Sequence, residues 1–254
     1  MIKVIKVGGG IIENDDNLSL FLDSFSKIEG PKILIHGGGR LATKIAEKLG
    51  YKTKMINGRR VTDESMLDVV TMVYGGLVNK KIVAKLQSMG INALGLSGAD
   101  GNLIKAHKRP NKKVDYGWVG DVDKINSNLL LNLIKSETVP VIAPLSHDGN
   151  GKMLNTNADT IANEVAKALA EKDEIQLILG FELNGVLKDF NNKSSVITKI
   201  TLDLFNQLKS DGLISEGMIP KLENAFDAIK EGVSSVRICN ALKINQDSGT
   251  FVSK

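Results

Sequence analysis

The chain has 254 residues, of which 42% are hydrophobic, 24% charged and only 4% aromatic. This is enough apolar material for a sizeable core in one or two domains of a soluble globular protein, and it excludes a long multidomain assembly. The formal net charge is +4, and the basic residues are scattered, so we expect no nucleic-acid partner, whereas a small anionic ligand is compatible with this charge.

The number of cysteines and the hydropathy of the chain indicate the cellular compartment in which the protein folds. Cys239 is the only cysteine, which excludes an internal disulfide and any CxxC metal or redox site and predicts a reducing, cytoplasmic environment. The first residues alternate lysines with apolar side chains, unlike a signal peptide. No run reaches the roughly 18 apolar residues that a membrane span needs, so we expect no membrane association.

Short apolar runs rich in Val, Ile and Leu recur along the chain, and each predicts a buried strand. These runs span residues 2–7, 32–35, 91–96, 139–143, 175–179 and 235–239. Apolar residues at helical spacing lie between them, at 41–49, 158–169 and 222–229. The alternation predicts an α/β fold with a mostly parallel sheet covered on both faces. Two stretches of mixed polarity, 51–60 and 102–121, predict hairpins or excursions beside that sheet.

Glycine clusters follow three of the predicted strands, at Gly8–Gly10, Gly37–Gly39 and in the run 95–101. Ligands of parallel sheets bind at the carboxyl ends of the strands, and glycine lets backbone N–H groups approach an anion closely. The clusters therefore predict a cradle for a phosphate or a carboxylate. The chain contains neither GxxxxGK[ST] nor GxGxxG, which argues against a P-loop and against a dinucleotide site.

Two lysines have positions that suit an anion. Lys6 lies in an apolar strand directly before the first glycine cluster, although an alternating strand residue can equally face solvent. Lys221 follows Pro220, a residue favoured in the first turn of a helix, where the helix dipole disfavours a cation unless an anion is near. The alternative for Lys221 is an exposed lysine with a small energetic penalty.

Other polar residues are candidates for the same site. Asn155, Asn157 and Asp159 precede an apolar helix, and capping alone explains one asparagine and the aspartate but not all three together. Arg60 stands in a polar loop, where its guanidinium fork suits a substrate carboxylate, unless it is an ordinary surface arginine. His36 precedes three glycines, and we expect it to order that turn rather than to catalyse.

Seven motifs in this order and spacing resemble those of the acetylglutamate kinases, within the amino-acid kinase family. They are Lys6-Val-Gly-Gly-Gly, His36-Gly-Gly-Gly39, Asn57-Gly-Arg-Arg60-Val-Thr, Gly95-Leu-Ser-Gly98, Gly117-Trp-Val-Gly120-Asp-Val, Asn155-Thr-Asn-Ala-Asp159 and Gly217-Met-Ile-Pro-Lys221. Each motif alone is weak, but together they cover the chain nearly end to end. Aspartokinases, nucleotide monophosphate kinases and carbamate kinases resemble it less.

The resemblance implies a three-layer αβα sandwich and an ATP-dependent transfer of phosphate to the side-chain carboxylate of N-acetyl-L-glutamate, in arginine biosynthesis. It also implies an N-terminal lobe, residues 1–172, for acylglutamate binding and dimerisation, and a C-terminal lobe, residues 173–254, for ATP, with one continuous sheet. The cofactors would be ATP and the Mg²⁺ that ATP carries, with no metal site of the protein itself. We expect a cytoplasmic homodimer.

Site residues follow from the same resemblance. Lys6 and Lys221 would stabilise the transferring phosphoryl group, and Asp159 would hold both lysines. Backbone N–H groups of the glycine turns would contact phosphate, at Gly8 and Gly9, with Gly38 adding a donor. Substrate would be bound by Gly38, Gly39, Arg60 and Asn155, with Arg60 on the α-carboxylate. Nucleotide would be bound by Glu182, Leu183, Gly185, Leu187, Leu213 and Ser215.

The chain departs from the family pattern at two places. The family usually carries Ser or Thr followed by Asp where this chain has Phe181 and Glu182, which affects the ribose or magnesium contacts expected there. The sequence begins almost at the first strand, without the N-terminal helix of arginine-inhibited members, so we expect no arginine feedback. Two alternatives stay open: the same transfer to N-succinyl-L-glutamate, and a non-catalytic nucleotide or amino-acid sensor on this fold.

Overall fold

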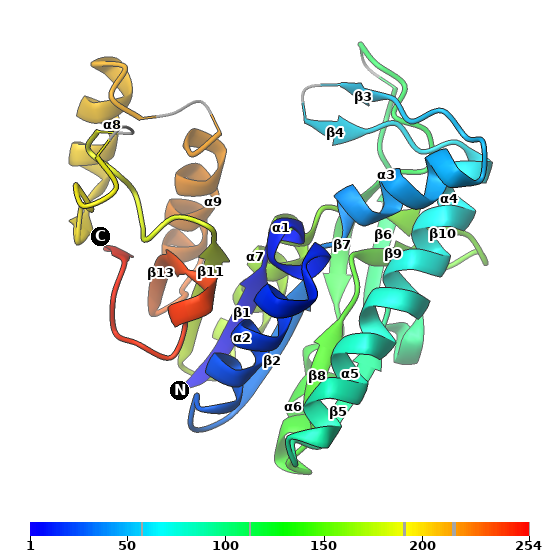
Figure 1. Ribbon diagram of the computed structural model, residues 1–254, viewed down its shortest axis with the longest axis horizontal. Coiled ribbons are helices and arrows are strands. Elements are labelled where there is room, and N and C mark those ends of the chain that lie inside the picture. The colour runs from blue at the N-terminus through cyan, green and yellow to red at the C-terminus, as the bar shows by residue number, and fades with distance from the viewer. Residues whose placement is uncertain (57, 112, 190–191, 215–216, 254) are drawn as a thin grey trace.

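The computed structural model describes residues 1–56, 58–111, 113–189, 192–214 and 217–253, and a mixed sheet forms its centre (Figure 1). The eight strands of this sheet are, in spatial order, β12 (Lys199–Ile200), β14 (Thr250–Val252), β13 (Ser235–Asn240), β11 (Ile175–Phe181), β1 (Ile2–Val7), β2 (Lys32–His36), β8 (Val139–Ile142) and β5 (Ala93–Leu96). The strands from β13 to β5 are parallel and are the six that the apolar runs predict. Only β14 pairs antiparallel, with β13.

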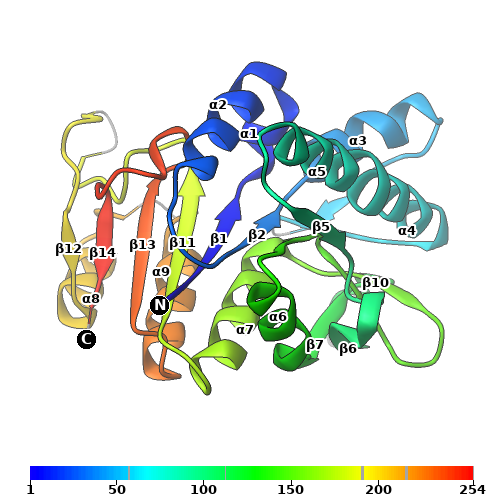
Figure 2. The ribbon, with the colours of Figure 1, turned by 90° about the horizontal axis from the view of Figure 1, so that it is seen from below.

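Helices cover both faces of the sheet, which confirms the three-layer α/β fold. One layer contains α1 (Gly9–Glu13), α2 (Asp15–Ser26), α3 (Gly39–Lys48), α4 (Glu64–Val70), a π-helix (Thr71–Val78) and α5 (Asn79–Ser88). The other contains α6 (Ser127–Lys135), α7 (Ala158–Ala170), α8 (Leu202–Ser210) and α9 (Ile219–Lys230). Figure 2 shows the two layers on opposite sides of the row of strands. No helix of these described ranges has the length and hydropathy to cross a bilayer.

The two stretches of mixed polarity leave the central sheet, as predicted. Residues 51–60 contain a hairpin of β3 (Met55–Ile56) and β4 (Arg59–Arg60), which lies above α3 in Figure 1. The second stretch belongs to a four-stranded sheet with the order β10 (Met153–Asn155), β9 (Leu145–His147), β6 (Ile104–Lys108) and β7 (Gly120–Ile125). Short 3₁₀ turns lie at Asp100–Asn102 and Ala241–Lys243.

The alternation of side chains along β1 divides its residues between two cores. Ile2 and Val4 pack in the core on the side of α7 and α9, whereas Ile5 and Val7 pack in the core on the side of α2. Successive residues of a strand point to opposite faces, so Lys6 shares the face of Ile2 and Val4. The sequence of β1 therefore directs one lysine toward the layer formed by α7 and α9.

Helices α7 and α9 both begin at the carboxyl edge of the sheet, because each runs back to the start of a parallel strand. The side chain of Asn157 caps α7 and accepts hydrogen bonds from the backbone N–H groups of Asp159 and Thr160, at 2.8 and 3.1 Å. Pro220 lies in the first turn of α9, as expected. Both predicted helix starts are confirmed, and each places one charged candidate beside the end of β1.

Candidate active site

Two of the three glycine clusters pack against each other at the carboxyl edge of the sheet. A Cβ atom at Gly37 would lie 3.0 Å from the backbone nitrogen of Gly9, and one at Gly38, whose φ is +154°, would lie 3.0 Å from the ring of Tyr74. Glycine therefore suits Gly37 because of the close approach of two backbones, and Gly38 because of its positive φ and the nearby ring. The cluster in the run 95–101 lines neither cavity of this site, and Gly98 there packs against β9, so its predicted share in the anion cradle is wrong.

Lys6 and Lys221 meet on the carboxylate of Asp159. The Nζ of Lys6 lies 2.7 Å from Oδ1, and the Nζ of Lys221 lies 3.6 Å from Oδ2. The side chains are 7% exposed for Lys6, 20% for Asp159 and 27% for Lys221. The alternatives that placed either lysine on an open surface are therefore ruled out by this geometry.

The charge state of Asp159 follows from its neighbours. Burial by itself raises the pKa of this carboxyl, but the ammonium groups of Lys6 and Lys221 outweigh burial and hold the pKa below its ordinary value. Asp159 is therefore ionised at neutral pH. One negative charge then faces two positive charges, and the cluster keeps a net charge of +1 for an incoming anion.

Two cavities meet at this cluster. The first, of about 220 Å³, is lined by the substrate-binding residues that the sequence predicts, Gly38, Gly39, Arg60 and Asn155. The second, of about 530 Å³, is lined by Gly8 to Gly10, Phe181, Glu182, Leu183 and Lys221. Lys6, Gly9 and Gly39 line both cavities. A group bound in one cavity can therefore reach a group bound in the other beside Lys6.

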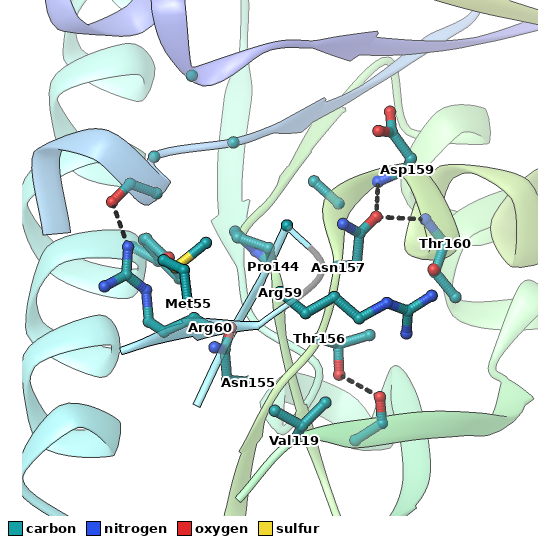
Figure 3. A pocket seen from close by; sticks show the side chains of 18 of the residues that line it. Met55, Arg59, Arg60, Val119, Pro144, Asn155, Thr156, Asn157, Asp159 and Thr160 are labelled. Atoms are coloured by element: carbon teal, nitrogen blue, oxygen red, sulfur yellow. Dashed lines mark hydrogen bonds between the residues drawn. The ribbon is translucent and has the colours of Figure 1, made fainter. Parts of the chain in front are cut away.

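Arg60 forms one wall of the first cavity, although not from the loop that we expected. It belongs to β4, and it is buried, which rules out the surface alternative. Its Nη2 donates to the backbone oxygen of Gly39 and to Oγ1 of Thr43, both at 2.7 Å. Figure 3 shows the guanidinium of Arg60 with one of these two hydrogen bonds. These partners fix the guanidinium beside the second glycine turn, where a carboxylate of a ligand can be recognised.

Asn155, at the end of β10, lines the same cavity as Arg60. Its amide donates to Oγ1 of Thr62 at 2.9 Å, which orients its side chain. Arg59 and Arg109 also line this cavity, and sequence reasoning missed both. Arg109 is ion-paired with Asp121, and Figure 3 shows the side chain of Arg59 extending beside Asn157 and Thr160. Arg59 belongs to β4 and Arg109 directly follows β6. Both residues join the cavity wall through the tertiary fold, which a local sequence pattern does not reveal.

The predicted nucleotide residues are only partly brought together. Glu182 and Leu183 line the second cavity, whereas Gly185, Leu187 and Leu213 do not. Gly185 packs against Thr250, and the side chain of Leu187 is buried. Ser215 lies outside the described residues, as does Asn57 of the Asn57-Gly-Arg-Arg60 motif.

Phe181 contributes a feature that the sequence reasoning did not foresee. The Nζ atoms of Lys6 and Lys221 lie 4.9 and 4.5 Å from the centroid of its ring. Both distances are within the range of a cation–π interaction. The next residue, Glu182, forms an ion pair with Arg40 at 3.9 Å, which is longer than the pairs of Asp159 with the two lysines.

His36 is buried and takes no part in lining either cavity. Its Nδ1 lies 2.8 Å from the oxygen of Gly37, and its Nε2 lies 3.1 Å from the amide nitrogen of Asn79. These partners assign the proton to Nδ1. Burial, only partly opposed by the bond to Gly37, lowers its pKa from 6.5 to about 4, so the ring is neutral at physiological pH. This geometry matches the expectation that His36 orders the glycine turn.

Comparisons with known proteins agree with this architecture. The model of the amino acid kinase family matches residues 1–240. An acetylglutamate kinase of Phocaeicola vulgatus is 57% identical over 253 residues, covering 100% of this chain and 98% of that protein. An acetylglutamate kinase of Methanopyrus kandleri is 39% identical, covering 98% and 99%. A crystal structure of a Streptococcus mutans protein superposes with a TM-score of 0.79 at 32% identity, covering 99% and 98%. The chain therefore belongs to the amino acid kinase family.

Proposed function

We propose that this chain transfers the γ-phosphoryl group of ATP to the side-chain carboxylate of N-acetyl-L-glutamate, giving N-acetyl-L-glutamyl 5-phosphate and ADP, as a step of arginine biosynthesis. The observation that carries the proposal is the Lys6–Asp159–Lys221 cluster at the junction of two cavities. Relatives named acetylglutamate kinase at 57% identity over the whole chain support this substrate.

The chemistry explains why cations matter more here than a general base. The acceptor carboxylate is ionised at neutral pH, so no proton needs to be removed before one of its oxygens attacks phosphorus and the bond to the ADP oxygen breaks. The obstacle is repulsion between anions, because two unit charges 4 Å apart cost about 4 kcal/mol at an effective dielectric of about 20. Lys6 and Lys221 would offset that repulsion and position the reactants in line.

Each cavity then has one reactant. The acylglutamate would occupy the smaller cavity, with its α-carboxylate on Arg60 and its polar groups on Asn155 and the backbone of Gly38 and Gly39. The phosphates would lie over Gly8 and Gly9 in the larger cavity, where Glu182 and Leu183 approach the nucleotide. The lobes would divide as 1–172 for the acylglutamate and 173–254 for ATP.

Magnesium would enter with the nucleotide. The described residues contain no group of three His, Cys, Asp or Glu side chains arranged to hold a metal ion, and the carboxylate of Asp159 already faces two ammonium groups. Mg²⁺ on the phosphates of ATP would supply further charge neutralisation, and this chain would supply the lysines and the glycine N–H groups.

We also propose a cytoplasmic homodimer. The buried Cys239 suits a reducing compartment. Met72 and Leu77, on the π-helix of the N-terminal lobe, are large apolar side chains about half exposed, which suits a contact with a second copy there. Light scattering of the purified protein measures its oligomeric state directly, and a monomer at all concentrations would contradict the proposed dimer.

The decisive experiment is a direct assay with MgATP and an acylglutamate, in which hydroxylamine traps the acyl phosphate. We expect hydroxamate formation with N-acetyl-L-glutamate. A parallel reaction with N-succinyl-L-glutamate tests the second acceptor. The observation that keeps this acceptor open is Arg59, whose guanidinium lines the smaller cavity and could pair with the extra carboxylate, whereas Arg109 is already paired with Asp121. Binding of ATP with no hydroxamate from either acceptor would contradict the proposal and support a non-catalytic sensor.

A further inference from the structure

Phe181 is placed by its strand on the same side of the sheet as the charged cluster. It is the last residue of β11, which pairs in parallel with β1, and Val7 lies opposite Gly180 in that register. Leu177 and Leu179 pack in the core beside α7 and α9, so Phe181 at the next position of the same face continues toward the N-termini of those helices. Its ring lines the larger cavity and is partly buried.

Asp159 alone does not balance the charges of the cluster. One carboxylate faces two ammonium groups, which repel each other, and the pair to Lys221 is the longer at 3.6 Å. Lys221 also enters from α9, whereas Lys6 enters from β1, and lysine stems have several rotatable bonds. The face of an aromatic ring is electrostatically negative and attracts ammonium groups without adding a full charge.

We propose that Phe181 is a positioning residue, whose ring keeps the ammonium groups of Lys6 and Lys221 together beside Asp159 before the substrates bind. Both nitrogens lie over this one ring, at 4.9 and 4.5 Å from its centroid. A second carboxylate in the same place would neutralise the cluster and repel phosphate, whereas the ring leaves the net charge of +1 available. The inference rests on the proposed kinase function.

A purely structural role makes a different prediction. If Phe181 only closes the edge of the core, a side chain of similar volume and hydrophobicity replaces it, and the electron density of the ring is irrelevant. If the ring attracts the lysines, fluorine atoms that withdraw electron density weaken the effect in steps while the shape stays nearly constant. Fluorinated phenylalanines at position 181 therefore separate the two roles.

The experiment compares wild type, three proteins with mono-, di- and trifluorophenylalanine at position 181, Phe181→Tyr and Phe181→Leu. We expect kcat to fall in order of fluorination, by roughly fivefold to tenfold in total, with both KM values changed less than about twofold. The kcat of Phe181→Leu should be roughly tenfold lower than that of wild type, and the kcat of Phe181→Tyr should stay near the wild-type value. Phe251→Leu is the matched control, a partly buried phenylalanine of the same sheet in β14, and it should keep kcat within about twofold.

A second measurement makes the result independent of turnover. Ring currents shift the NMR signals of protons that lie over an aromatic ring, so the ε-methylene signals of Lys6 and Lys221 should be displaced in wild type and return toward ordinary values in Phe181→Leu. Unchanged signals would overturn the inference. Displaced signals with a flat kcat across the fluorinated series would also overturn it, because the ring would then only pack.

The same two readouts separate this inference from the proposed function. If wild type forms no acyl phosphate, the kinase function fails, and the lysine signals across the fluorinated series then decide the role of Phe181. A displacement that is lost stepwise with fluorination supports the positioning role, and one that stays constant overturns it. If wild type forms acyl phosphate and kcat falls stepwise across the fluorinated series, both the kinase function and the positioning role of Phe181 are supported.

Discussion

Replacing Asp159 by Asn tests the centre of the charged cluster, because it keeps the size of the side chain and removes its charge. The Nζ of Lys6 would then remain buried beside Lys221 without a counter-charge. Two unit charges 2.7 Å apart attract by about 6 kcal/mol at an effective dielectric of about 20. Breaking a buried pair from one side costs about 3–5 kcal/mol. Because Asp159 is 20% exposed, we expect the lower end, a loss of about 3 kcal/mol in the free energy of unfolding.

The assay is urea unfolding of wild type, Asp159→Asn, Lys6→Met and the double variant, followed by circular dichroism and fluorescence. The double variant leaves no uncompensated charge at Lys6, so we expect a coupling free energy of about 2 kcal/mol. Asp23→Asn is the matched control, because Asp23 and Lys27 also lie 2.7 Å apart but more than half exposed, and it should cost at most about 0.5 kcal/mol. Additive effects of Lys6→Met and Asp159→Asn would refute the reasoning.

Three further predictions concern turnover, substrate affinity and pH. Lys6→Ala or Lys221→Ala should each lower kcat at least roughly 100-fold, the scale of one lost preorganised donor, and near-normal turnover of a folded variant would contradict the assignment. Arg60→Ala should mainly raise KM for the acylglutamate, and a selective rise in KM for ATP would place Arg60 in the wrong cavity. Since the unfolded chain protonates His36 near pH 6.5 and the folded chain only at about 4, the stability from its burial is complete above pH 6.5 and is lost as the pH falls toward 4. Between about pH 8 and pH 5 this loss should be about 2 kcal/mol in urea titrations, and His36→Gln should show a shallower pH dependence; an equal one would exclude His36 as the cause.

The parallel part of the central sheet was predictable because its strands are buried on both faces. Such strands are continuous apolar runs, which a sequence displays without any knowledge of their neighbours. The predicted strand 2–7 coincides with β1, whereas the predicted strand 91–96 begins two residues before β5. The helices from α4 through the π-helix to α5 were not predicted, because Gly75 and Gly76 interrupt their pattern and packing against the sheet outweighs that local preference.

Local signals predict only part of the candidate site, and the resemblance to the family supplies the cavity residues such as Arg60 and Asn155. Helix capping and the proline at a first turn fixed the surroundings of Asp159 and Lys221, and both helix starts are confirmed. The sequence predicts a loop at Arg60, because a two-residue strand such as β4 is too short to show a periodic pattern. Phe181 departs from the family pattern, but its contact with two lysines depends on strands and helices distant in sequence, which no local pattern encodes.

The register of β1 links the fold to the chemistry. Lys6 lies opposite Leu179 of β11 and Ile35 of β2, and period-two alternation puts its side chain on the face of α7 and α9. A slip of one residue would turn every side chain of β1 to the other face, so Val7 would enter the site and Lys6 would enter the core beside α2. Burying that ammonium group without a partner costs far more than burying valine. The same apolar pattern that stabilises the sheet therefore also excludes the register in which the lysines are apart, and the cationic cluster is a consequence of correct core packing.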